Sequence, residues 1–243
     1  MRSAVRLPKQ IDPCPIVESV AEIRFETSLP DDAVFGVVYN AVKERYPSVE
    51  KLPILQIPEA IRSGNPDLVI LPQYRLRGER FMIQVGPRSI SSAVTGPYPG
   101  WHDWRTEINY AFDKIQRIDV IHAVTRFGLR YIDVFDGDVF PKLVLKLGVD
   151  QENVTSPNMG LRVVFDRGRF NCLLQINNDS VFGVEGTPAS RRSVLDVDTY
   201  LVGGEGEFFT QAEMFLEEAH ATQKELFFGL LSPQFLASLN PTY

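Results

Sequence analysis

The sequence predicts an α+β protein in which an antiparallel sheet is covered on one side by helices. Three observations lead to this fold class. Several segments alternate polar and apolar side chains with the two-residue period of a strand, and short glycine or proline turns separate them. Helical periodicity appears at only a few places between or after these segments. The regular strand–helix alternation of a parallel, doubly wound fold is missing, so we do not expect that fold.

The bulk composition is that of an ordinary globular protein. The chain has 243 residues, of which 44% are hydrophobic and 23% charged, and this length fits one large domain or two small ones. No stretch approaches the roughly 18 apolar residues of a membrane helix. The basic N-terminus is followed by prolines instead of an apolar core, which argues against a secretory signal. We therefore expect a cytoplasmic protein without a membrane partner.

Cysteine content and net charge narrow the kinds of partner. Cys14 and Cys172 form no C-x-x-C pair and have no histidine cluster nearby, so neither a zinc site nor a disulfide framework is expected. The net charge of −6 disfavours broad nucleic-acid binding, although a local basic face is still compatible with it. The sequence indicates no cofactor. The remaining partners are another protein, a second copy of this chain, or a small polar or anionic ligand.

Residues 15–26 predict the first strand. Ile23 and Phe25 fall on one side of it, whereas Glu22 and Arg24 fall on the other. One face of this strand should therefore be core and the other charged.

A helix should follow, with Asp31 as a candidate N-cap and Pro47 as its end. Residues 52–70 are rich in proline, and their pattern predicts no element. Residues 74–94 then predict three short strands of a meander, and a second helix carries its apolar stripe from Trp104 to Ile115.

The second half of the chain repeats this plan loosely. Strands are expected over 124–134, 161–165, 170–176 and 193–202, with the hairpin turn of the middle pair at Asp166-Arg167-Gly168, and a long helix over 207–231 closes the half. One α+β domain with two similar halves, about 14–120 and 121–243, is the resulting prediction. A duplicated helix-grip or TATA-binding-protein-like arrangement would fit this order.

Three segments resemble a known protein family. They are Pro15-Ile16-Val17-Glu18-Ser19-Val20-Ala21-Glu22-Ile23-Arg24-Phe25, then Phe127-Gly128-Leu129-Arg130-Tyr131-Ile132, then Ala219-His220 with Glu225-Leu226-Phe227. The chain is similar over nearly its whole length to a sporadically distributed prokaryotic family whose opening reads approximately P-I-V-E-A-V-x-E-I-R-F. Ser19 stands where that family usually has alanine. The resemblance implies membership and fold, and it transfers no catalytic residue because the family has no established activity.

The main candidate site is a charged sheet face. Its candidate residues each fall on the polar side of a predicted strand, and they are Glu18, Glu22, Arg24, Arg75, Arg77, Arg126, Arg130, Arg162, Asp196 and Asp198. Alternation places each set on one side of its own strand, whereas strand register decides whether the sets meet. A solvated outer face with cross-strand ion pairs is the competing explanation. If the sets meet, carboxylates and guanidiniums together could bind an anion or a peptide.

The last helix is a second candidate surface. Its phenylalanines Phe208, Phe209, Phe215, Phe227 and Phe228 offer more aromatic area than one apolar stripe buries, which suggests a dimer interface. Burial of the helix between two layers of core is the alternative.

These features favour a non-enzymatic binding protein that uses the charged face or the last helix. A metal-dependent phosphate- or nucleotide-processing enzyme using Glu18, Glu22, Arg24, Arg130 and Asp198 is an alternative. Its weakness is that the strand reads Glu22-Ile23-Arg24-Phe25-Glu26, without the E-x-E-x-K order of triphosphate tunnel enzymes. The sporadic occurrence of the family that the chain resembles suggests a third role, as a sensor or accessory component of a prokaryotic defence or toxin–antitoxin system. No catalytic or metal-ligating residue is predicted.

Overall fold

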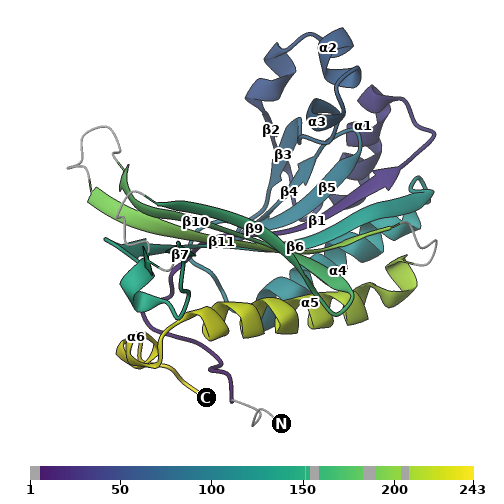
Figure 1. Cartoon of the computed structure of the whole chain (residues 1–243). Helices are drawn as coiled ribbons and strands as arrows, with labels where there is room; N and C mark the ends of the chain where they lie inside the picture. Colours follow the sequence, from purple (N-terminus) through teal and green to yellow (C-terminus); the bar gives the residue numbers. More distant parts are fainter. Residues whose placement is uncertain (1–5, 151, 154–158, 183–189, 204–207) are drawn as a thin grey trace. The chain divides into compact units, whose positions relative to one another are not determined.

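The computed structural model describes residues 6–150, 152–153, 159–182, 190–203 and 208–243. It shows a nine-stranded antiparallel open sheet packed against several helices, which confirms the predicted fold class (Figure 1). The strands of this sheet are β1 (Ile16–Glu26), β2 (Ser48–Lys51), β3 (Tyr74–Arg77), β4 (Phe81–Val85), β5 (Ser89–Val94), β6 (Ala123–Asp136), β9 (Gly160–Arg167), β10 (Phe170–Phe182) and β11 (Ser190–Val202). A separate two-stranded sheet pairs β7 (Gly148–Val149) with β8 (Glu152–Asn153).

Helices are fewer than strands and follow the expected order. They are α1 (Asp31–Val42), α2 (Glu59–Ser63), α3 (Pro66–Val69), α4 (Trp101–Arg117), α5 (Phe208–Leu230) and α6 (Pro233–Ser238), with short 3₁₀ helices η1 (Pro53–Gln56) and η2 (Phe140–Lys142). None of the helices in the described ranges combines the length and the apolar character that crossing a membrane requires.

The sheet order is β2-β3-β4-β5-β1-β6-β11-β10-β9. The first strand of the first half, β1, therefore lies beside the last strand of its own meander, β5, and α4 follows. In the second half β6 lies beside β11 in the same way, and α5 follows. Both sequence halves thus run from a strand through a meander to a helix. Whether they arose by duplication stays a prediction.

The chain forms two compact units that interleave along the sequence. Unit 1 contains Met1–Val17, Arg130–Thr199 and Ala219–Tyr243, and unit 2 contains Glu18–Leu129 and Tyr200–Glu218. The strands β1, β6 and β11 and the helix α5 are each divided between the units. No single boundary near residue 120 separates them.

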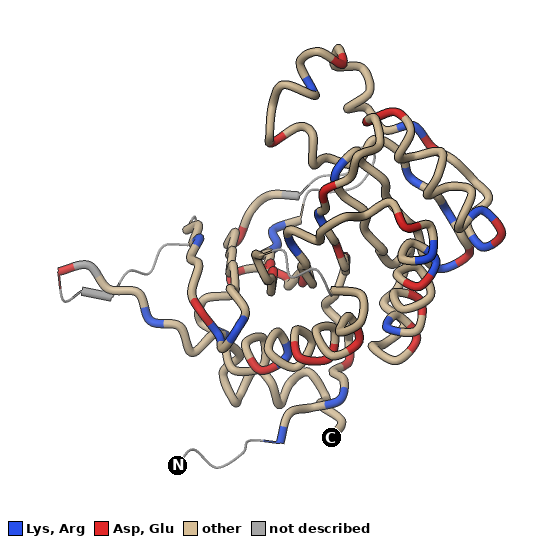
Figure 2. Tube along the Cα trace, turned by 90° about the vertical axis from the view of Figure 1, so that its right-hand side faces the viewer, with Lys and Arg blue, Asp and Glu red and all other residues tan. Residues whose placement is uncertain are grey.

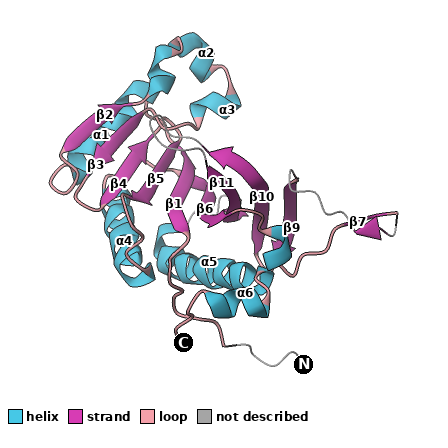
Figure 3. Ribbon diagram, turned by 90° about the vertical axis from the view of Figure 1, so that its left-hand side faces the viewer, coloured by secondary structure: helices cyan, strands magenta, loops and turns pink. Residues whose placement is uncertain are grey.

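In unit 2 the helices α1 and α4 cover the apolar side of β1 and of the meander (Figure 3). Ile23 and Phe25 of β1 are buried, and so are Trp104 and Ile108 of α4, because the alternation of the strand and the stripe of the helix point toward the same core. The charged side chains of β1 consequently lie on the opposite face of the sheet.

The N-cap expected for the first helix, Asp31, differs from the observed one. Pro30 occupies the N-cap of α1, while Asp31 lies in the first turn and pairs with Arg88 at 2.9 Å. Gly100, with φ of +97°, precedes α4, and Asp103 lies in its first turn. Both aspartates still suit their positions, because the helix dipole favours negative charge in the first turn.

Residues 52–70, for which the sequence predicted no element, form η1, α2 and α3. A proline lies in the first turn of η1 and of α3, and another is the N-cap of α2. The backbone N–H that proline lacks would have no partner within the helix at these positions, so proline is tolerated there. Asn65 caps α3 by accepting a hydrogen bond from the backbone N–H of Asp67 at 2.8 Å. Short capped turns of this kind have too few residues for a helical period to show in the sequence.

Unit 1 has its own core between the strands β6, β9, β10 and β11 and the helices at the end of the chain. Its buried members include Phe135, Leu174, Leu195 and Phe227. The β9–β10 hairpin turns at Gly168-Arg169, one residue later than predicted. Gly168 has a φ of +64°, and a type II′ turn needs such a positive φ at its first central position.

Candidate functional site

Five polar side chains of unit 2 line up across five neighbouring strands. The register pairs Glu22 of β1 with Ser91 of β5, Ser91 with Gln84 of β4, Gln84 with Arg75 of β3, and Arg75 with Glu50 of β2. Directly paired residues point to the same face of a sheet, and neighbouring strands lie about 4.8 Å apart. We call these five residues the polar row. Tyr74, the residue before Arg75 on β3, stacks on Phe35 of α1, so strand alternation places the polar row on the face opposite α1.

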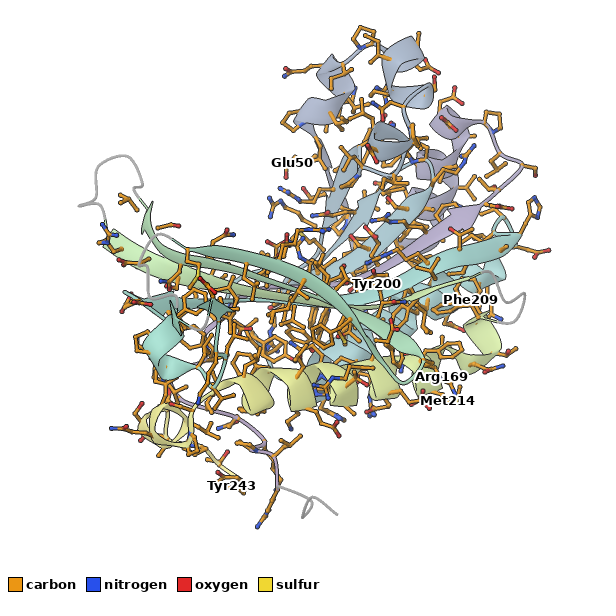
Figure 4. The ribbon with its side chains drawn as sticks, viewed as in Figure 1. Glu50, Arg169, Tyr200, Phe209, Met214 and Tyr243 are labelled. Atoms are coloured by element: carbon orange, nitrogen blue, oxygen red, sulfur yellow. The ribbon has the colours of Figure 1, made fainter. Side chains whose placement is uncertain are left out.

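One end of the polar row is an ion-pair cluster around Glu22. Its carboxylate accepts hydrogen bonds from Arg24 Nε at 2.8 Å and from Arg126 Nη1 at 3.1 Å. The Arg126 guanidinium also lies over the Tyr200 ring, 4.6 Å from its centroid (Figure 4 labels Tyr200). A Cβ at Gly128 would come within 2.4 Å of Arg126 Nη1. Glycine at this position therefore gives the arginine room to lie along the strand.

The other end of the row is a second cluster, around Glu50 (Figure 4). Arg77 donates to its carboxylate from Nε at 3.1 Å and from Nη2 at 2.9 Å, and Arg75 donates from Nη1 at 3.2 Å. Hydrogen bonding by Arg77, reinforced by the charge of Arg75, lowers the pKa of Glu50 below its ordinary value. Two guanidiniums share one carboxylate here, so this cluster carries a formal positive charge that Glu50 does not balance.

The middle of the polar row holds hydrogen-bonding groups without partners. Arg75 Nε is buried and has no hydrogen-bond partner. Within the described ranges, the side chains of Gln84 and Ser91 also make no hydrogen bond, although Ser91 is only 5% exposed. Three donor-bearing side chains thus stand on consecutive strands beside a cluster with excess positive charge. Arg75 Nε is a buried donor without an acceptor, which is costly, so this arrangement favours an acceptor-rich ligand.

Gln84, Ser91 and Glu50 were not among the site residues predicted from the sequence. Signals for the first two were present, because Gln84 alternates with the buried Ile83 and Val85, and Ser91 lies two positions from Ser89. Neutral polar residues within a strand are common, and only the strand register shows that these lie in one row with charged residues.

Unit 1 contains a smaller polar cluster on β6, β11 and β10. Arg130 donates from Nε to Asp196 Oδ1 at 2.8 Å and from Nη2 to Oδ2 at 2.6 Å, and Gln175 donates to the same Oδ2 at 3.0 Å. Arg162 of β9 is paired with Gln175 across the strands and is exposed. The Asp196 carboxylate already accepts three hydrogen bonds, so this cluster resembles a structural ion pair more than a binding site.

The structure therefore brings the predicted residues together in groups. In unit 2 Glu22, Arg24 and Arg126 form one cluster, and Arg75 and Arg77 join Glu50 in the other, while Glu18 is exposed near the start of β1. Arg130, Arg162, Asp196 and Asp198 belong to unit 1, where Asp198 lies two positions along β11 from Asp196. Charges of both signs are spread along the trace in Figure 2, without a long run of one sign.

The phenylalanines of α5 are largely used inside the chain. Phe208 packs against Phe112, Phe127 and Phe215 within unit 2, and Phe227 stacks with Phe135 in unit 1. Phe208, Phe215 and Phe227 are buried, whereas Phe209 and Phe228 are half-buried. Only these last two leave aromatic surface that a partner could contact.

Asp133 was not predicted as a special residue, yet it is buried and lacks a full set of partners. It belongs to the row of β6 whose other members, including Tyr131 and Phe135, pack toward α5. It is 2% exposed, and its Oδ2 has no hydrogen-bond partner. Burial, reinforced by the charge of Asp196, raises the pKa of Asp133 to about 8. The sequence signal was an acidic residue in an otherwise apolar or aromatic alternation.

Outside the polar row, few groups in the described part of the chain are arranged to bind a metal ion or a phosphate. In the part of the chain that the structure describes, no three His, Cys, Asp or Glu side chains lie together as metal ligands. Asp138 accepts hydrogen bonds from the Phe140 backbone at 2.9 Å and from Asn178 Nδ2 at 2.8 Å, so it stabilises a turn. Most of the glycine-rich segment Gly203-Gly204-Glu205-Gly206 lies outside the described residues. His220 contacts Tyr131 Oη through Nδ1 at 3.2 Å.

Comparison with known proteins adds no further identification: no protein-family model and no curated protein matches this chain.

Proposed function

We propose that this chain is a binding protein and that the polar row of unit 2 receives a small oxyanion, either a carboxylate or a phosphate. The observation that carries the proposal is a set of hydrogen-bonding groups on consecutive strands that have no partner among the described residues: Arg75 Nε and the side chains of Gln84 and Ser91. Their spacing of about 5 Å per strand lets two neighbouring side chains reach one oxyanion.

Electrostatics support an anion over a cation or a neutral ligand. Glu50 is held ionised by Arg77 and Arg75, yet it balances only one of the two guanidiniums. A planar guanidinium offers several donors in a fixed fork, which matches the geometry of carboxylate and phosphate oxygens. Gln84 and Ser91 add neutral donors, so a bound anion gains hydrogen bonds without meeting another carboxylate between the two clusters.

Isothermal titration calorimetry on the full chain tests this proposal. Inorganic phosphate and succinate serve as the two probes, and sodium chloride serves as a control for ionic strength. Saturable binding of phosphate but not succinate would identify a phosphate-type ligand, and the reverse result a carboxylate. Heat no larger than that of chloride for both probes would contradict the proposal.

Matched variants connect the binding to the polar row. Arg75→Met should weaken binding at least about tenfold because it removes a charge-assisted donor. Ser91→Ala removes only one neutral donor and should weaken binding by a smaller factor, about three- to tenfold. Arg117→Met removes the same charge from an exposed helical pair with Asp113 and should leave binding unchanged. Equal affinities in all three variants would place the anion elsewhere.

We also propose membership in the sporadically distributed prokaryotic family that the sequence resembles. Its support is the three quoted segments. In the central segment Gly128 leaves room for the neighbouring Arg126 guanidinium, which a Cβ at this position would displace.

A further inference from the structure

The strand β9 forms one end of the sheet, and no described strand pairs with its outer edge. Among the described strands it pairs with β10 alone. Both Val163 and Val164 are exposed, at 38% and 45%, although valine is a residue that strands usually bury on one face. The opposite edge, β2, has only four residues and carries Lys51, which are the usual devices that protect an edge from pairing. With eight residues β9 is a longer edge, and it carries neither lysine nor proline.

Two charged residues of β9 have no partner in the described part of the chain. Arg162 and Asp166 point to the same face of the hairpin, and the residues beside them on β10 are the neutral Gln175 and Asn171. Both are exposed. This face of the strand therefore presents one positive and one negative side chain that have no ion-pair partner among the described residues, with Val164 halfway between them.

The backbone fixes which residues can bond to another strand. Arg167 and Phe170 close a two-residue turn and so exchange both hydrogen bonds across the hairpin. Bonded and non-bonded pairs alternate from there, which leaves the N–H and C=O groups of residues 160, 162, 164 and 166 pointing outward. A second antiparallel strand must pair through these residues.

We propose that β9 pairs with β9 of a second copy of this chain, antiparallel, about a two-fold axis at Val164. In this register each Arg162 stands opposite Asp166 of the partner, and Val164 stands opposite its own copy. All outward backbone groups of these three residues are then bonded. Moving the axis to residue 162 would oppose two Arg162 side chains, and moving it to residue 163 would leave the charges without partners. Charge complementarity therefore selects both the partner and the register.

Sedimentation velocity of the full chain, compared among charge variants, tests this pairing. The wild type should dimerise. Asp166→Arg places four arginines around the axis and should weaken dimerisation at least about tenfold, because like charges directly opposite are destabilising. The exchange variant Arg162→Asp with Asp166→Arg restores opposite charges and should restore the dimer. Since both side chains are exposed and make no ion pair within the described residues, neither variant should alter the circular dichroism spectrum.

A cross-link checks the register directly. Val164→Cys, in a chain that also carries Cys14→Ser, should be joined to its own copy by a thiol reagent with a one-carbon spacer, because paired Cα atoms lie about 5.5 Å apart. Val181→Cys serves as the control: Val181 lies on β10, is 65% exposed and is far from the proposed axis, so a cysteine at this position should not cross-link to its own copy. A wild type that is monomeric at its highest soluble concentration would overturn the proposal. So would a dimer that Asp166→Arg leaves intact, or a monomer that binds an unrelated extended peptide along β9.

Discussion

Replacing Asp133 with asparagine is expected to stabilise the protein, by an amount that increases with pH. The carboxyl is 2% exposed, and its Oδ2 finds no hydrogen-bond partner. Because burial and the nearby Asp196 raise the pKa of Asp133 to about 8, the folded protein keeps this carboxyl protonated near neutral pH. Asparagine has nearly the same shape and cannot ionise.

The magnitude follows from the difference between the folded and unfolded pKa values. An unfolded aspartate titrates near about 3.9, so between that pH and about pH 8 the folded state binds one proton more than the unfolded state. Folding stability is then greatest below the unfolded pKa and falls as the pH rises toward the folded pKa. The slope is about 1.4 kcal/mol per pH unit. From pH 5 to pH 7 the wild type should lose about 2.7 kcal/mol relative to Asp133→Asn.

Urea unfolding of both proteins at pH 5, 6, 7 and 8 measures this difference. Asp113→Asn, an exposed aspartate of α4, serves as the control and should track the wild type across this range within about 0.5 kcal/mol. A free-energy difference between wild type and Asp133→Asn that stays constant from pH 5 to pH 7 would refute the reasoning. It would mean that Asp133 is ionised in the folded protein.

Three further substitutions test local features of unit 2 by urea unfolding. Gly86→Ala should destabilise the protein by about 2 to 4 kcal/mol, because the new Cβ would lie 2.6 Å from the backbone carbonyl oxygen of Leu71. A loss below about 0.5 kcal/mol would show that this backbone moves to make room. Gly36→Ala should instead stabilise by about 0.5 to 1 kcal/mol, since it lies within α1 with no atom near its Cβ, and any destabilisation would contradict this assignment. Tyr46→Phe removes a hydrogen-bond donor to the buried carboxylate of Glu107 and should lower the free energy of unfolding by about 1 to 3 kcal/mol. In the control Tyr39→Phe the lost hydroxyl makes only a 3.5 Å contact, so the decrease should be below about 0.5 kcal/mol. Equal decreases in the two variants would show that the buried hydrogen bond does not stabilise the fold.

The faces of single strands could be predicted from the sequence. The alternation in residues 15–26 correctly separates the buried Ile23 and Phe25 from Glu22 and Arg24. A period of two residues is a local property, so one strand is enough to reveal it. The fold class followed from the same patterns, together with the order of the strands and helices.

The composition of the candidate site could not be predicted in the same way. Glu50 joins the site only because β2 pairs with β3, and residues 48–51 are too few to show a strand period. Which side chains of β1, β3, β4 and β5 meet depends on register, which is a tertiary property. For the phenylalanines of α5 the sequence suggested an interface because of their number. Neighbouring elements instead bury Phe208 and Phe227 within the chain, and their packing depends on the tertiary structure.

Nuclear magnetic resonance of the Arg75 Nε–Hε group tests the central claim most directly. The full chain, labelled with ¹⁵N, is titrated with phosphate and then with succinate, and the arginine Nε signals are assigned with Arg75→Met. If the polar row binds an oxyanion, the Arg75 signal should shift saturably with at least one of the two anions, while that of Arg117 should not. An Arg75 signal that stays unchanged with both anions, or that moves no more than the Arg117 signal, would contradict it.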